Sequence, residues 1–213
     1  MATDDLIARL AGDLKPVQPD QVGRRVAIGF GASLAVSSLL MYFWLGLRPD
    51  MMSAVWTWPF WVKLGYTFAL SLAGIWAVKR IAYPLGRIRP HLVAIAMAVT
   101  ALVALAIGQL SMMPPESHMP LLMGKSVAVC TLYITTLAMP FLVGAFWILR
   151  GLAPTRLTLA GAAAGLAAGG LGSLVYSFHC TEGGMPFIAI WYTLGVMGPA
   201  LIGALAGRYL LRW

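Results

Sequence analysis

The chain has 213 residues, of which 60% are hydrophobic and only 10% are charged, and its formal net charge is +8. Soluble domains carry about 25% charged residues, so this composition excludes a soluble globular protein and predicts a membrane protein. The basic residues are scattered along the chain instead of forming one basic face, which argues against a nucleic-acid-binding protein.

Six apolar stretches are each long enough to cross a bilayer, which takes about 20 residues in a helix. Backbone polar groups must all be paired in lipid, and stretches of this length favour helices over the shorter strands of a barrel. We therefore predict an all-α membrane protein, a six-transmembrane-helix bundle that occupies residues 26–213. The expected helices are 26–47, 61–78, 92–113, 126–149, 157–178 and 185–207. The first is too long for the apolar region of a cleaved signal peptide, so we expect it to be retained.

The distribution of lysine and arginine predicts the orientation of this bundle. Only three such residues fall on one side of the predicted helices, namely Arg48, Lys63 and Lys125. Twelve fall on the other side: Arg9, Lys15, Arg24, Arg25, Lys79, Arg80, Arg87, Arg89, Arg150, Arg156, Arg208 and Arg212. Short basic loops stay in the cytoplasm, so both termini are expected to be cytoplasmic. The loop 179–184 then faces outward, which in a bacterium is the oxidising, periplasmic side.

Residues 1–25 are the expected cytoplasmic segment. Leu6, Ile7, Leu10 and Leu14 recur at helical spacing, and Pro16 ends the short helix that they predict. A helix this short is marginal alone in water. Three interpretations remain open: a helix flat on the membrane, which its acidic residues disfavour; a disordered tail with accidental periodicity; or a docking segment that folds into a groove of a partner.

Small residues recur along the predicted helix 157–178. Gly161, Gly165, Gly169 and Ser173 stand four apart, and Gly203 and Gly207 repeat the pattern in 185–207. Such spacing lets another helix approach closely. Pro140 and Pro199 are candidates for kinks in their helices.

Groups that bind soft metals or react with oxidants gather on the predicted outer side. The only two cysteines, Cys130 and Cys180, lie there together with His118, His179 and Glu182. Seven methionines lie there as well: Met51, Met52, Met112, Met113, Met119, Met123 and Met185. Thiolates and thioethers select soft metals and are oxidised first, although methionines at helix ends are also ordinary apolar filler. We expect Cys130 and Cys180 to be used as thiols, as a disulfide or as metal ligands, with His179, His118, Glu182 and Met185 as possible auxiliary ligands.

Catalytic motifs are missing from the sequence. It contains no CxxC, HExxH, P-loop or GxSxG pattern, so we predict no enzymatic activity. No charge lies in the middle of a predicted helix, whereas pumps and secondary transporters normally require one. The arrangement is typical of an outward detector joined by a bundle to an inward docking segment.

The sequence resembles the NrsF-type membrane anti-sigma factors of Gram-negative bacteria along its whole length. The resemblance rests on the N-terminal DDLIARLAGDLKPV, six membrane helices, a cysteine early in 126–149 (Cys130) and a second cysteine beside the loop 179–184 (Cys180). It implies that the protein holds an extracytoplasmic-function sigma factor at the inner membrane, away from RNA polymerase. It also implies that metal or oxidative stress acts through the two cysteines and releases the sigma factor.

The same resemblance implies the residues that bind the partner, which are Leu6, Ile7, Leu10, Asp13, Leu14, Pro16 and Val17. The chain lacks the His-xxx-Cys-xx-Cys pattern of zinc-binding anti-sigma factors, and the inner loops 79–90 and 150–156 are candidates for sharing in the docking. No cofactor is predicted beyond a soft metal ion or a disulfide at Cys130 and Cys180. The alternative function is a small carrier for a soft, copper-like metal that uses the outer Met, Cys and His ligands. A membrane oxidoreductase is disfavoured because the two cysteines are so far apart in sequence.

Overall fold

The computed structural model describes residues 21–81, 89–152 and 154–212, with isolated positions before residue 13. Within these residues, six helical segments are long and apolar enough to cross a membrane, which confirms the predicted number. They are 21–45, 58–81, 90–112, 115–150, 157–176 and 185–210. Most of the proposed docking segment, and the inner loop 82–88, lie outside the described residues, so the helix expected before Pro16 stays a prediction.

The long helices and the short elements between them alternate along the chain. The long ones are α2 (Gln21–Leu40), α4 (Trp58–Ile81), α5 (Arg89–Met112), α7 (Val127–Arg150), α8 (Leu157–Tyr176) and α10 (Thr193–Leu210). The π-helical turns η1 (Met41–Leu45) and η3 (Ile188–Tyr192) extend α2 and precede α10, and α9 (Met185–Phe187) precedes η3. One end of the bundle carries α3 (Met51–Ala54), η2 (Pro115–Ser117) and α6 (His118–Met123). Neither these short elements nor the π-helical turns follow from hydropathy.

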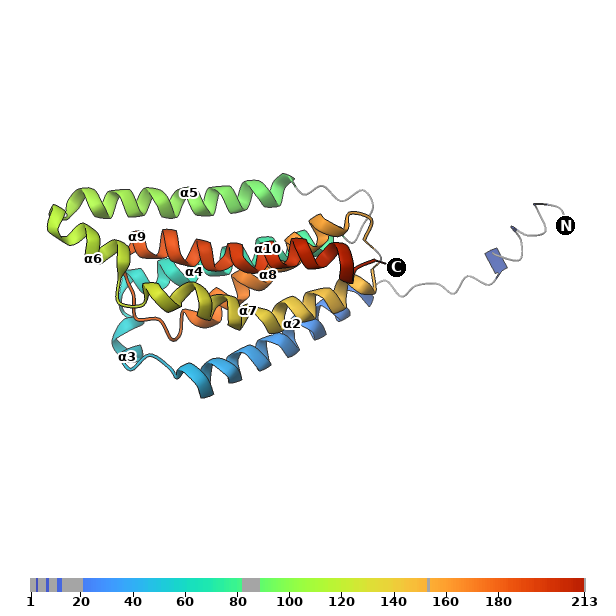
Figure 1. The fold of residues 1–213 in the computed structure, drawn as a ribbon, viewed down its shortest axis with the longest axis horizontal. Coiled ribbons are helices and arrows are strands. Elements are labelled where there is room, and N and C mark those ends of the chain that lie inside the picture. The colour runs from blue at the N-terminus through green and yellow to red at the C-terminus, as the bar shows by residue number, and fades with distance from the viewer. Residues whose placement is uncertain are drawn as a thin grey trace.

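The helix α8 occupies the middle of the bundle, with α4, α7 and α10 around it (Figure 1). The predicted small-residue stripe on α8 meets α10. A Cβ atom at Gly161 or Gly165 would overlap the backbone of α10 at Gly203 or Pro199. At Gly169 it would lie 2.7 Å from the carbonyl oxygen of Val196. The prediction of close helix approach is therefore confirmed.

The other faces of α8 are just as tightly packed. A Cβ atom at Gly170 would lie 2.8 Å from the backbone nitrogen of Ser71 in α4, and one at Gly172 would lie 2.8 Å from that of Ala138 in α7. In lipid, helices associate through such close packing because there is no hydrophobic driving force between them. A displacement of α8 must therefore move its neighbours.

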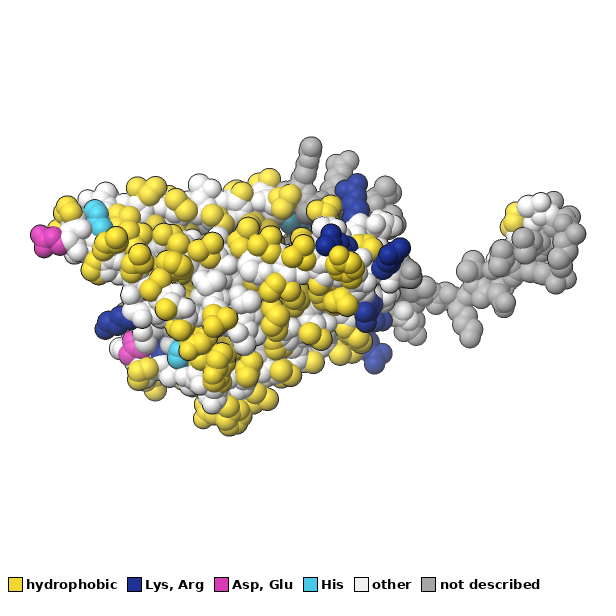
Figure 2. Space-filling view, viewed as in Figure 1, with side chains coloured by type: hydrophobic (Ala, Val, Ile, Leu, Met, Phe, Trp, Pro, Cys, Tyr) yellow, Lys and Arg dark blue, Asp and Glu magenta, His cyan; other side chains and the backbone are white. Residues whose placement is uncertain are grey.

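Basic side chains gather at the end of the bundle where α2 begins and α10 ends (Figure 2). There, Arg25 Nη2 donates to the carbonyl oxygen of Trp147 at 3.0 Å, and Arg150 Nε donates to that of Leu210 at 2.9 Å. These bonds connect α2 with α7 and α7 with α10. We call this end the arginine end and the opposite one the cysteine end.

Candidate functional site

Both cysteines lie in the interior at the cysteine end. Cys130 is in the first turn of α7 and is 0% exposed, while Cys180 follows α8 and is 3% exposed. Both are free thiols in the buried core, which also contains Tyr176 and Tyr192. The Tyr192 hydroxyl is buried without a hydrogen-bond partner among the described residues. The structure thus brings the two predicted sensor residues into the same region.

A buried lysine holds the loop that carries Cys180. Lys63 of α4 is 1% exposed, and its Nζ donates to the carbonyl oxygens of Cys180 at 2.7 Å and Glu182 at 3.0 Å. The same ammonium group lies 5.8 Å from the centre of the Tyr192 ring. A charge in a membrane helix is costly unless it faces the bundle interior and is paired there with polar groups. Lys63 meets that condition by capping carbonyl groups beyond the end of α8.

The connection after α2 holds the same loop from another side. Arg48 Nη1 lies 3.4 Å from the Cys180 carbonyl oxygen, and the Arg48 backbone NH donates to Phe178 at 3.1 Å. A ring nitrogen of His179, Nδ1, lies 2.9 Å from the Gly46 carbonyl oxygen. The residues around Cys180 are therefore fixed by both α4 and the segment after α2.

Arg48 also forms an ion pair at the cysteine end, outside the membrane-spanning segments. Its Nε and Nη2 atoms donate to the two carboxylate oxygens of Asp50 at 2.8 and 2.7 Å. This bidentate hydrogen bonding lowers the pKa of Asp50 and raises the pKa of Arg48. The pair keeps the Arg48 side chain oriented toward the Cys180 carbonyl group.

Glu182 links this loop to the start of α7. Its Oε1 accepts a hydrogen bond from the Lys125 backbone NH at 2.7 Å, and the Ser126 hydroxyl lies 3.4 Å away. The Cys130 backbone NH in turn donates to the Ser126 carbonyl oxygen at 2.9 Å. Gly124, with φ +57°, makes the approach possible, because a Cβ there would lie 2.8 Å from the Glu182 carboxyl group. The loop of one cysteine is thus joined to the helix of the other.

The expected auxiliary ligands have other partners here. His118 Nε2 lies 2.9 Å from the Leu110 carbonyl oxygen, the Glu182 carboxylate contacts the start of α7, and Met185 is buried. Among the described residues, no three His, Cys, Asp or Glu side chains converge as a metal site would require. Whether a metal binds Cys130 and Cys180 stays a prediction.

Most of the methionines expected to guide a metal lie on the outside of the protein. Met52, Met112, Met113, Met119 and Met123 are exposed at the surface. Of the methionines deeper in the helices, Met97 and Met197 are 62% and 47% exposed, whereas Met41 is 6% exposed and Met139 is half-buried. Met97 and Met197 therefore do not line an internal path, which weakens the carrier alternative.

Sequence reasoning assigned Lys63 and Arg48 only to the outer side and missed their contacts with the cysteine loop. A signal for Lys63 does exist, since a single lysine within the apolar stretch 61–78 must find polar partners inside the protein. The partners themselves are main-chain carbonyl groups, which leave no pattern in the sequence. Arg48 gives no comparable signal, because it lies in a connection where a charged residue is ordinary.

Comparisons with known proteins bear on this arrangement. Residues 10–213 match the family model described as NrsF, negative regulator of sigma F. The chain belongs to this family. It is 41% identical to the anti-sigma-F factor NrsF of Caulobacter vibrioides and 36% identical to the probable anti-sigma-F factor NrsF of Azospira oryzae, in each case over the full length of both chains. No solved structure matches the chain.

Membership of the NrsF family confirms the resemblance found in the sequence. The family is one of regulators rather than enzymes, and its role implies a sigma factor as the partner. Together with six helices that can span a membrane, this identifies a multi-pass membrane anti-sigma factor.

Proposed function

We propose that this protein holds an extracytoplasmic-function sigma factor at the inner membrane through its cytoplasmic segment 1–25 and releases it when Cys130 and Cys180 react with a metal or an oxidant. The observation that carries the proposal is the burial of both cysteines at the cysteine end, where Glu182 joins the loop of Cys180 to the start of the helix that carries Cys130. In this proposal the arginine end is cytoplasmic, in agreement with the positive-inside rule, and the cysteine end faces the periplasm.

The chemistry at the cysteines can take two forms. An oxidant such as hydrogen peroxide removes two electrons and two protons as the sulfur atoms join in a disulfide, and the peroxide becomes two molecules of water. A soft divalent metal instead displaces one proton from each thiol and binds the thiolates. Because the thiols are buried, either reagent gains access during a local opening of the cysteine end.

Either reaction disturbs a tightly packed region. A disulfide draws the two sulfur atoms together, and a metal ion is inserted between them. Either change alters the separation of α7 from the loop after α8. Forced changes in a packed core typically cost 1–3 kcal/mol. Lys63, Arg48 and Glu182 hold this loop. The resting arrangement is therefore destabilised where α4, α7 and α8 meet.

The helix α7 offers a direct route from the cysteines to the docking segment. Cys130 lies in its first turn, and Trp147 lies near its other end. There the Trp147 carbonyl accepts the hydrogen bond from Arg25, whose guanidinium group stands 4.4 Å from the centre of the Trp147 ring. Arg25 is the last residue of the proposed docking segment, so a shift of α7 acts on the point where that segment joins the bundle.

Switching the partner from mostly bound to mostly free needs roughly 3–5 kcal/mol of differential stabilisation. A disulfide typically contributes 2–4 kcal/mol, and a structural metal site contributes more. On the docking side, burying three or four apolar side chains contributes roughly 1.5–3 kcal/mol each, against 2–5 kcal/mol or more to order the segment. A reversible complex with this range of control is therefore feasible.

Capture of the partner tests the proposal. The membrane-inserted protein is used as bait, in its full-length form and without residues 2–20, before and after treatment with peroxide or cadmium. A full-length variant with Leu6, Ile7 and Leu10 all changed to Ser tests the apolar stripe, and Asp4→Asn with Asp5→Asn is its matched control on the polar side.

We expect the full-length bait and the Asn control to capture an extracytoplasmic-function sigma factor and to lose it on treatment. The truncated and Ser baits should capture none. Capture without loss would place the sensor elsewhere, and capture of another class of sigma factor would correct the partner. Failure of the full-length bait to capture any sigma factor would contradict the docking role and favour the carrier alternative.

A further inference from the structure

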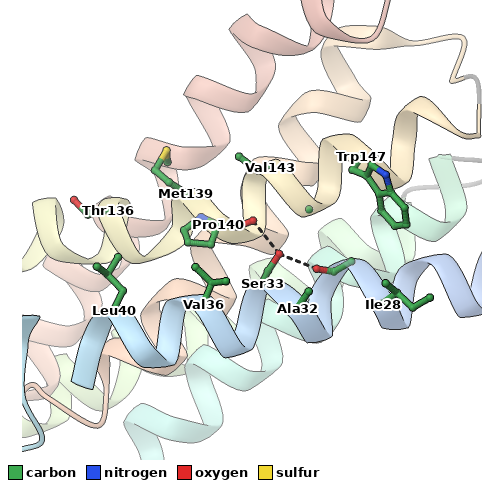
Figure 3. A pocket seen from close by; sticks show the side chains of 12 residues that line it. Ile28, Ala32, Ser33, Val36, Leu40, Thr136, Met139, Pro140, Val143 and Trp147 are labelled. Carbon is green, nitrogen blue, oxygen red and sulfur yellow. Dashed lines mark hydrogen bonds between the residues drawn. The ribbon is translucent and has the colours of Figure 1, made fainter. Parts of the chain in front are cut away.

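A groove follows the outside of the bundle between α2 and α7 (Figure 3). It encloses about 760 Å³. Its wall consists of small and apolar residues of the two helices, including Ala32, Val36, Leu40, Met139 and Val143. Val36 and Val143 are 55% and 69% exposed, so the groove opens away from the core. In a membrane it faces lipid.

The polar groups in this groove already have partners. The Ser33 hydroxyl donates toward the carbonyl oxygens of Gly29 at 2.7 Å and Pro140 at 2.9 Å (Figure 3). The Thr136 hydroxyl donates to the Leu132 carbonyl oxygen at 2.9 Å. An occupant therefore has no polar group to satisfy there, and the groove suits a hydrocarbon chain.

At the arginine end the groove continues into a polar hollow of about 370 Å³ that shares Ile28 and Trp147 with it. Arg24 and Arg25 line this hollow, and no carboxylate does among the described residues. Arg25 uses Nη2 on Trp147, but its Nε is buried without a hydrogen-bond partner in the described part of the chain. Arg24 is exposed and Arg25 is half-buried, so positive charge stands where the apolar groove ends.

We infer that this continuous site binds an anionic phospholipid, with an acyl chain in the groove and the phosphate against Arg24 and Arg25. From Ile28 to Leu40 the groove follows about 18 Å of helix, close to the roughly 15 Å depth of one leaflet's hydrocarbon. Arginine binds phosphate oxygens through paired N–H donors, and basic pockets between membrane helices recognise anionic headgroups. This inference does not depend on the sigma factor.

Charge favours a lipid over a second copy of the chain in this groove. Copies inserted in the same orientation place their arginine ends at the same depth, so the arginines of one copy would meet those of the other. An anionic headgroup removes that repulsion.

Native mass spectrometry of the full-length protein tests the inference. The protein is taken from vesicles of equal parts phosphatidylglycerol and phosphatidylcholine, and the retained lipids are counted. Ala32→Phe fills the groove, and Ala35→Phe, at an exposed position of α2 outside the groove, is its control.

A double variant, Arg24→Gln with Arg25→Gln, removes the charge. Its control at the same end of the bundle is Arg156→Gln. Arg24→Gln alone leaves the Arg25–Trp147 contact intact, so it remains informative if the double variant misfolds.

We expect the wild-type protein and both controls to retain phosphatidylglycerol in preference to phosphatidylcholine. Each arginine should contribute about a fivefold preference, so the double Gln variant loses roughly 25-fold and the single variant about fivefold. Ala32→Phe should lose the retained lipid altogether. Equal retention of the two lipids by the wild-type protein would overturn the inference, as would equal behaviour of Ala32→Phe and Ala35→Phe. A lipid-free dimer that Ala32→Phe dissociates would assign the groove to a second copy instead.

Discussion

Lys63 donates hydrogen bonds to two carbonyl groups of the loop that carries Cys180. Leaving a buried carbonyl group without its donor costs about 1–3 kcal/mol, so Lys63→Met should let the loop open more often. In a Cys130→Ser background, we expect maleimide to label Cys180 about tenfold faster in this variant, because labelling of a buried thiol follows the population of the open state.

The matched control for that measurement is Lys125→Met. Lys125 is exposed at the same end of the bundle, and its contact with Glu182 uses the backbone NH rather than the side chain. In the Lys125→Met variant, maleimide should label Cys180 at the same rate as in the Cys130→Ser protein without a second substitution. Equal rates for Lys63→Met and Lys125→Met would show that Lys63 does not control access to Cys180.

The Arg48–Asp50 pair predicts a dependence of stability on acid. Arg48 lowers the pKa of Asp50 in the folded state. Ionised Asp50 therefore stabilises the folded protein at pH values above its unfolded pKa of about 3.9. This stabilisation is lost as the pH falls through the lower pKa that Asp50 has in the folded protein. Since Asp50 is half exposed, the effect is small. Asp50→Asn should remove this part of the acid-induced fall in Tm below about pH 4. The control Glu116→Gln, on an exposed turn, should retain it. Identical profiles of Tm against pH for the two variants would contradict the role of the pair.

At the residue scale, the sequence predicted that the two cysteines lie at the same end of the bundle but not what holds the loop of Cys180. Cys130 and Cys180 lie beside opposite ends of predicted helices on the same side of the bilayer, and an antiparallel bundle brings such positions together. Lys63 and Arg48 contact the loop through its carbonyl groups. Every residue has such a carbonyl, so no residue type in the sequence marks these contacts.

At the scale of elements, the contacts of α8 predict a sharp difference between two glycines. A Cβ atom at Gly165 would overlap the backbone of α10, whereas one at Gly108 in α5 would meet nothing within 4 Å. Overpacking typically costs 1–3 kcal/mol, while alanine is the better helix former by up to about 1 kcal/mol. Gly165→Ala should therefore lower the Tm, and Gly108→Ala should leave it unchanged or raise it. Equal thermal shifts for the two variants in the same detergent would contradict the packing of α8 on α10.

The elements also show where prediction from sequence ends. Bilayer thickness fixes the length of an apolar helix, so five of the six spans were predicted with both ends within five residues of the structure. The fourth helical segment begins at 115 instead of 126, because η2 and α6 precede α7. The stripe of Gly161, Gly165 and Gly169 was predicted as well. Gly170 and Gly172 were not, because a four-residue repeat describes one face of a helix. Only the arrangement of the bundle, with α8 surrounded on several sides, requires small residues on the other faces.

At the scale of the whole molecule, the arginine end is expected in the cytoplasm, because short loops rich in lysine and arginine are not translocated. Alkaline phosphatase needs disulfides and so becomes active only in the oxidising periplasm. A fusion after Trp213 should therefore be inactive, and a fusion after Gly183, in the cysteine loop, should be active. The reverse pattern would place the cysteines on the cytoplasmic side and contradict the proposed direction of signalling.

The last expectation joins the two ends of the molecule. Cys130→Ser with Cys180→Ser keeps the size of both side chains but removes the thiolate chemistry, so the resting packing and the hold on the sigma factor should persist. A reporter gene driven by that sigma factor should stay repressed under peroxide or cadmium, whereas the wild-type protein allows induction. The single variants should each respond far less than the wild-type protein, because a disulfide or a two-thiolate site needs both sulfur atoms. Full induction in the double variant would separate the anti-sigma role from the cysteines, and constant induction without stress would show that the thiols are needed for the resting packing itself.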